Sequence, residues 1–103
     1  MGATGFEEPL WKGDEMNEME FKRRAAELGY GEPQVKAYPP NATSELHTHD
    51  FSAFAMVAEG EFTLAFEDGD ATYGPGDSCE VAAGTRHAEK SGPAGATVWF
   101  ATR

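Results

Sequence analysis

After Gly31 the chain becomes a succession of short apolar segments separated by turn residues. The segments are QVKAY, ELHTH, AFAMVA, EFTLAFE, DATY, SCEV, RHAEK and ATVWFAT. Strands this short, recurring about every 8 to 12 residues, are typical of a β-sandwich or barrel. Asp68-Gly69 is the pair that a type I′ hairpin turn prefers, and Glu59-Gly60 predicts a second turn. The pattern therefore predicts an all-β fold.

An arm and a helix are expected ahead of these segments. Trp11 is a candidate anchor in an aperiodic, glycine-containing stretch. Asn17 followed by Glu20 predicts a capping box, and Phe21 begins an apolar stripe that stops at Gly29. The predicted organisation is an arm at residues 1–13, a helix within residues 14–29 and a β-barrel at residues 30–103, forming one domain.

Composition narrows the classes of partner and compartment. The chain has 103 residues and a net charge of -10, so its surface repels phosphate backbones and anionic lipids. We therefore expect no nucleic-acid partner and no membrane partner. No apolar run approaches the roughly 20 residues of a membrane span, and no signal-peptide pattern is present. These features, together with a single Cys79, predict a cytoplasmic protein.

The segment AFAMVA at residues 53–58 is apolar on both faces of a strand. A strand with one wet face would alternate apolar and polar residues, so both sides of this one must be covered. One side is expected to face the barrel interior, and the other to meet the helix or a second subunit. This is the reason to expect a homodimer.

The three histidines of the chain are candidate metal ligands. His47 and His49 lie two residues apart, which on a strand places both side chains on one face, about 6.6 Å apart along the chain. That pair alone fits an exposed strand edge equally well. His87, delivered by the turn at Gly84, raises the number of imidazoles to three, which is enough to bind a metal ion.

Two spaced motifs carry a resemblance to the cupins. The first cupin motif contains HxH, three or four residues, Glu, six residues and Gly. The second runs Gly, five residues, PxG, two residues, His, three residues and Asn. The matching residues here are His47, His49 and Gly60 in the first motif and Gly76, Gly84 and His87 in the second. The resemblance covers roughly residues 34–102. It implies a small single-domain cupin, a double-stranded β-helix or jelly-roll barrel, with His47, His49 and His87 as metal ligands.

The chain departs from the family pattern at one ligand position. Ala53 stands where cupins usually carry a glutamate ligand, while Ala82 and Ser91 replace residues that shape turns. Three neutral imidazoles leave a divalent ion its full +2 charge and more open coordination positions. Such an open three-histidine site suits a small anionic ligand. Its metal is one divalent transition ion, Fe, Ni, Zn, Mn or Cu.

Several other residues are candidate parts of the site. Asp50 could replace the missing glutamate only through a bulge, and is otherwise a turn residue. Glu80 is expected to face solvent. Cys79 is either a reactive thiol or a small core residue, and Arg86 either binds an anion or is an exposed turn residue. Residues that could line a pocket or fill the core are Phe51, Phe54, Met56, Phe62 and Trp99.

Two functions of different class follow from this site. The first is a metal-dependent small-molecule enzyme, either dioxygenase-like or an isomerase or lyase. The resemblance supports oxygen chemistry, because three-histidine iron cupins include thiol and diketone-cleaving dioxygenases. The second is a non-catalytic cupin module that binds or senses a small ligand. No residue beyond the metal ligands is assigned as a general acid or base, so the catalytic residues are not specified.

Overall fold

The computed structural model describes residues 16–103, which form one helix and five strands. The elements are α2 (Glu18–Glu27), β1 (Gln34–Tyr38), β2 (Ala53–Phe66), β3 (Gly69–Tyr73), β4 (Ser78–Val81) and β5 (His87–Thr102). The strands confirm the all-β prediction with one N-terminal helix. The predicted arm at residues 1–13, including Trp11, lies outside the described residues.

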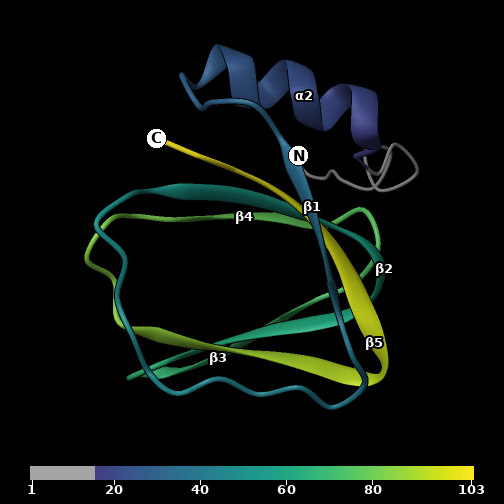
Figure 1. The fold of residues 1–103 in the computed structure, drawn as a ribbon, viewed down its shortest axis with the longest axis vertical. Coiled ribbons are helices and arrows are strands. Elements are labelled where there is room, and N and C mark those ends of the chain that lie inside the picture. Colours follow the sequence, from purple (N-terminus) through teal and green to yellow (C-terminus); the bar gives the residue numbers. More distant parts are fainter. Residues whose placement is uncertain (1–15) are drawn as a thin grey trace, which may run out of the picture.

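Two long strands build the barrel. The strands pair antiparallel in the order β1-β5-β2-β3, and β4 also pairs with β2. Figure 1 shows β2 and β5 bending from one wall of the barrel to the other, with α2 lying across the upper wall. The pairing of β2 with β5 is irregular around Gly60, whose φ is +80°. A Cβ at Gly60 would lie 2.1 Å from the carbonyl oxygen of Gly95 on β5, so the bend requires glycine there.

Three predicted connections differ in the structure. Glu59-Gly60 is a bulge inside β2 and not a turn, so AFAMVA and EFTLAFE form one strand. RHAEK and ATVWFAT likewise join within β5. The hairpin between β2 and β3 is present, but its two-residue turn is Glu67-Asp68, because Gly69 already pairs with Phe66. In each case the hydrogen-bonded pairing of the strands continues through a glycine. The backbone conformation of that glycine is one that residues with a side chain rarely adopt.

Helix α2 begins as its sequence predicts. The Asn17 side chain accepts a hydrogen bond from the backbone N–H of Glu20 at 2.9 Å, which confirms the N-cap. The Glu20 carboxylate pairs with Arg23 on the helix surface instead of returning to the cap. Phe21 is fully buried and stacks on Phe54 of β2, with ring centroids 4.9 Å apart. Helix α2 therefore packs against the outer face of the barrel.

Two apolar clusters cover the two faces of β2. The outer cluster, beneath α2, contains Phe21, Ala25, Tyr30, Phe54, Met56 and Ala101, with Trp99 packed against it. The inner cluster, within the barrel, contains Val57, Phe62, Leu64, Ala96 and Val98. The prediction that both sides of AFAMVA are covered is confirmed, and α2 supplies the outer cover. The homodimer stays a prediction. No helix within residues 16–103 is long and apolar enough to cross a membrane.

Candidate metal centre

The segment that carries His47 and His49 is not the regular strand predicted for residues 45–49. It is extended and joins the sheet through an isolated bridge between His47 and His87. The N–H of each residue donates to the carbonyl of the other, at 2.8 and 2.9 Å. The carbonyl of His49 accepts from the N–H of Gly84 at 2.8 Å, where the chain turns toward β5. The backbone thus places the two histidine motifs against each other.

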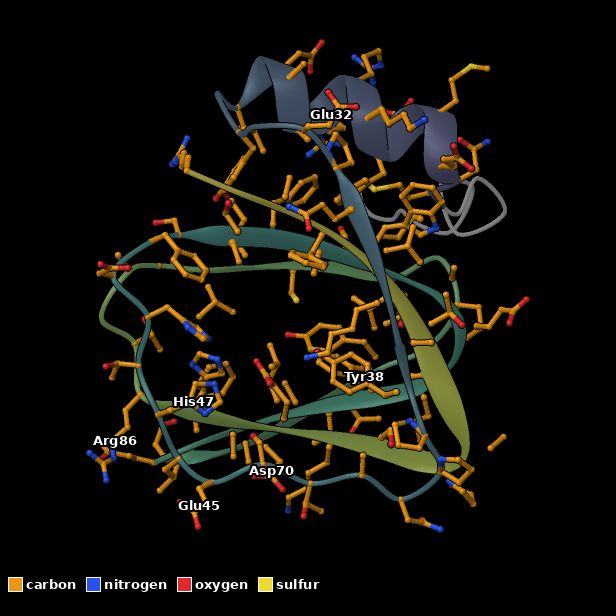
Figure 2. All side chains as sticks on the ribbon, viewed as in Figure 1. Glu32, Tyr38, Glu45, His47, Asp70 and Arg86 are labelled. Atoms are coloured by element: carbon orange, nitrogen blue, oxygen red, sulfur yellow. The ribbon has the colours of Figure 1, made fainter. Side chains whose placement is uncertain are left out.

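The three predicted imidazoles come together inside the barrel. The ring centroid of His47 lies 4.7 Å from those of both His49 and His87, and the latter two are 5.3 Å apart. His87 is buried, while His47 and His49 are partly exposed. Figure 2 shows His47 reaching from its loop into the interior. The structure therefore assembles residues that are separated by up to 40 positions in the sequence.

A fourth polar residue joins the cluster, and the sequence analysis missed it. Glu89 follows His87 by two positions on β5, so both side chains lie on the inner face of the strand. Its Oε2 atom is 3.3 Å from Nε2 of His87 and 3.6 Å from Nε2 of His47. One potential ligand atom from each of His47, His49, His87 and Glu89 lies within 4.8 Å of all the others. Residues two apart on a strand share a face, so the rule that places His47 beside His49 also places Glu89 beside His87. The sequence therefore contained the signal for Glu89.

The hydrogen bonds of two histidines fix which nitrogen faces the cluster. Nδ1 of His47 lies 2.6 Å from the carbonyl of Glu45, and Nδ1 of His87 lies 2.9 Å from that of Thr85. A carbonyl can only accept, so each Nδ1 carries the proton and donates it. In the neutral rings each Nε2 is then an acceptor, and both face the Glu89 carboxylate, which also only accepts. A cation between them resolves this opposition, and the donor set fits a divalent transition metal.

The third imidazole is oriented by a ring instead of a carbonyl. His49 stacks on Phe51, with centroids 4.7 Å apart and planes inclined by 21°. Within residues 16–103 the His49 ring makes no hydrogen bond to protein. Burial lowers the pKa of His49, and repulsion by His47 and His87 when these are protonated lowers it further. The ring is therefore kept in the neutral form that a metal ligand requires.

The remaining candidates lie outside the cluster. Asp50 is exposed and contributes no ligand atom. Glu80 is exposed and accepts a hydrogen bond from the hydroxyl of Tyr30 at 2.7 Å, on the helix side of the sheet. Arg86 pairs with Glu67 at 3.5 Å and points away from the barrel (Figure 2). Asp50, Glu80 and Arg86 therefore lie at the surface, as expected if they have no role in the site.

A cavity of about 200 Å³ extends from the cluster into the barrel. His49, His87 and Glu89 lie at its polar end, and most of the other lining residues are apolar. Phe51 and Phe62 line it as considered, whereas Phe54, Met56 and Trp99 belong to the outer cluster. Cys79 also lines it, and burial raises the pKa of its thiol to about 11, which makes it a poor nucleophile.

The chain thus folds as a small barrel of bent antiparallel strands, inside which three histidines converge on a candidate metal site. The Cupin domain family matches residues 34–100 of the chain, and the protein therefore belongs to the cupin family. Comparison with curated proteins gives no match. The family membership confirms the fold expected from the two motifs.

Solved structures of low sequence identity share this fold. An RmlC-like cupin from Shewanella frigidimarina has a TM-score of 0.60 at 23% identity, with 68% of this chain and 62% of that chain covered. The DMSP lyases RdDddP and RnDddQII give 0.63 at 18%, covering 69% and 37%. Oxalate decarboxylase from Lactobacillus farciminis, in a formate complex, gives 0.59 at 20%, covering 68% and 22%. The chain thus spans less than two thirds of these proteins, and the likeness establishes the fold alone.

Proposed function

We propose that this protein is a metal-dependent enzyme that acts on a small molecule in the barrel cavity. One divalent transition metal would be held by His47, His49, His87 and Glu89. The observation that carries the proposal is the opposition of the two Nε2 acceptors to the Glu89 carboxylate, at 3.3 and 3.6 Å. This opposition supports a bound cation, because a neutral, metal-free cluster would leave these acceptors without a donor.

Glu89 changes the charge expected of the centre. With three imidazoles alone a divalent ion would keep its +2 charge, whereas the Glu89 carboxylate lowers the total to +1. The carboxylate that the family motif would supply from position 53 is thus supplied from β5, and Ala53 leaves its own side of the cavity free. When bound, such a metal supplies Lewis-acid chemistry, or oxygen chemistry if it is iron. The chain would hold it with these four side chains. The backbone carbonyls of Glu45 and Thr85 orient the imidazoles of His47 and His87, and mostly apolar side chains surround the cavity.

We favour three reaction classes for this site, those of a dioxygenase, an isomerase and a lyase. Cupin-fold structures named as DMSP lyases and as an oxalate decarboxylase support the view that this fold accommodates chemistry on small molecules. A small anionic substrate would complement the +1 centre. No described residue of the cavity is an evident general base apart from the cluster itself, so the metal and its bound groups are expected to dominate the chemistry.

Metal analysis tests the first half of this proposal. Protein purified without added metal should contain about one transition-metal ion per chain, and His47→Ala should contain far less. His47→Ala is compared with Thr48→Ala, a substitution of the exposed neighbour on the same segment. Sub-stoichiometric metal in the wild type, after supplementation with each of the five candidate ions, would overturn the metal site.

Activity assays test the second half. Oxygen uptake with a panel of thiols and diketones should show turnover that is lost in His47→Ala if the protein is an iron dioxygenase. Product analysis of the same panel without oxygen detects isomerase or lyase activity. A stoichiometric metal with no turnover on either panel would favour the other function considered, a cupin that binds a small ligand without chemistry.

A further inference from the structure

Tyr38 enters the same cavity as the metal cluster from another element. It is the last residue of β1, and its ring lies 5.0 Å from that of Phe62 in the inner cluster. Figure 2 shows Tyr38 and His47 reaching into the barrel interior from opposite sides of the view. Lys36, two residues earlier on the same face of β1, also lines the cavity, and its Nζ lies 4.8 Å from the centre of the Tyr38 ring. Tyr38 and Lys36 thus form the β1 wall of the cavity.

The Tyr38 hydroxyl has no hydrogen-bond partner among residues 16–103. Its side chain is partly buried and lines the cavity, where burial and, to a smaller extent, the nearby charge of Glu89 together raise the pKa of the phenol to about 12. The hydroxyl therefore keeps its proton and can donate it in a hydrogen bond. A partly buried donor has poorer access to water, so a group that enters the cavity and accepts this hydrogen bond gains affinity.

The cavity also offers space for an apolar body beside the cluster. Its walls include Ala53, Leu64, Val98 and Phe100. A volume of about 200 Å³ lies below the roughly 300–1,000 Å³ of sites for drug-sized ligands, so only a small molecule is accommodated. Small aromatic or branched aliphatic groups bury their surface in such a space without leaving polar atoms unpaired.

Charge selects the head group of that molecule. A divalent metal bound with Glu89 carries +1, which one negative charge neutralises. Lys36, which also lines the cavity, adds a positive charge on the β1 side. Anions are therefore favoured over neutral molecules of the same shape. An oxygen of the head group that does not bind the metal can accept the hydrogen bond from Tyr38.

We propose that the cavity binds small anions with an apolar body and an oxygen-bearing head, such as a carboxylate or enolate, and that the Tyr38 hydroxyl donates a hydrogen bond to that head. This inference rests on the proposed function, since it places the head at the metal held by the cluster. It adds a substrate class and a substrate-contacting residue that neither motif includes.

Calorimetric titration with benzoate tests the inference. Benzoate combines one negative charge with an apolar ring, acetate has the head without the body, and benzamide has the ring without the charge. Metal-saturated protein should bind benzoate at least about tenfold more tightly than acetate, because ring burial is favourable. It should also bind benzoate more tightly than benzamide. Equal affinity for benzoate and acetate, or for benzoate and benzamide, would overturn the substrate class.

Tyr38→Phe removes the proposed contact and keeps the ring. It should weaken benzoate binding about tenfold, which is typical of losing one hydrogen bond to a charged acceptor. Tyr30→Phe is the matched control, because Tyr30 lies in the outer cluster and bonds Glu80 there. Unchanged benzoate affinity in Tyr38→Phe, or an equal loss in Tyr30→Phe, would show that Tyr38 does not contact the ligand.

Metal content separates this inference from the proposed function. Each sample is analysed for bound metal before titration, and Tyr38→Phe should retain as much as the wild type. Stoichiometric metal without benzoate binding would overturn the inference and leave the metal site intact. Failure to bind metal would overturn the proposed function itself. Equal benzoate affinity with and without metal would overturn the placement of the head group at the cluster.

Discussion

The carboxylate of Glu89 lies 3.3 Å from Nε2 of His87, two residues before it on β5. Both side chains point inward because alternate residues of a strand share a face. The cupin motif places its glutamate after HxH, at the position that Ala53 occupies here. This chain thus brings a carboxylate to its histidines from a different strand, and the position at Ala53 becomes part of the cavity wall.

Glu89→Gln should weaken metal binding while keeping the fold. The amide has nearly the same shape as the carboxylate but no charge, and a neutral oxygen is a poorer ligand for a divalent ion. We expect the metal affinity to fall at least about tenfold, because even substitutions of residues that only hydrogen-bond to metal ligands usually cost that much. Competition with a chelator of known affinity measures it.

Glu45→Gln is the control for this substitution. It removes the same charge from an exposed side chain two residues from His47, and it preserves the backbone carbonyl that orients the imidazole. Its metal affinity should remain close to that of the wild type. An equal loss in both variants would mean that Glu89 acts only through its general charge, and would contradict its role as a ligand.

Cys79 should react slowly with iodoacetamide in the folded protein. Burial raises its pKa to about 11 from an ordinary 9.0, so at pH 8 the reactive thiolate is about a hundredfold rarer than in the unfolded chain. Alkylation in buffer and in urea, followed by mass spectrometry, compares the two rates. A native rate close to the unfolded rate would show that the thiol is accessible and ionised.

The same thiol gives the stability of the protein a defined pH dependence. Between about pH 9 and 11 the unfolded state loses the Cys79 proton while the folded state retains it. Fewer protons are then bound in the unfolded state, so the free energy of unfolding falls as the pH rises through this window. Cys79→Ala should show a shallower fall over the same range in urea titrations at successive pH values. Parallel curves for the two proteins would contradict the shift.

Local signals in the sequence predicted much of the fold. Asn17 predicted the cap of α2, because a short polar side chain satisfies a free N–H at the helix start. The histidine spacing predicted the three imidazoles of the cluster. Glu89 was not predicted, because the family motif places its carboxylate after HxH, although the alternation along β5 already places Glu89 beside His87.

Long-range constraints explain the connections that were predicted wrongly. Glu59-Gly60 has the composition of a turn, but Gly60 lies against the backbone of Gly95 in the neighbouring strand, and the ladder passes through it. Sequence cannot distinguish a turn from a bulge at such a pair until the partner strand is known. The role of Tyr38 is likewise visible only when β1 is placed beside the cavity.

Phe21→Ala should destabilise the protein by about 3–5 kcal/mol, the usual cost of removing a fully buried phenylalanine. The ring stacks on Phe54 and joins α2 to the barrel, so its loss opens a void between them. Urea unfolding measures the change. Met19→Ala, at an 80% exposed position on the same helix, should stay within about 0.5 kcal/mol of the wild type. Similar costs for both would show that the helix does not pack as described.

Two glycine substitutions separate backbone conformation from close approach. Gly60 and Gly84 have nearly the same φ, +80° and +83°, so alanine at either position costs roughly 1–3 kcal/mol in conformational strain. Only Gly60 also meets backbone, since its added Cβ would lie 2.1 Å from the Gly95 carbonyl oxygen, whereas nothing lies within 4 Å at Gly84. Gly60→Ala should therefore be more destabilising than Gly84→Ala by at least about 1 kcal/mol in urea unfolding. Equal costs would mean that β2 and β5 do not approach each other closely at the bulge, and that the bend of the barrel has another origin.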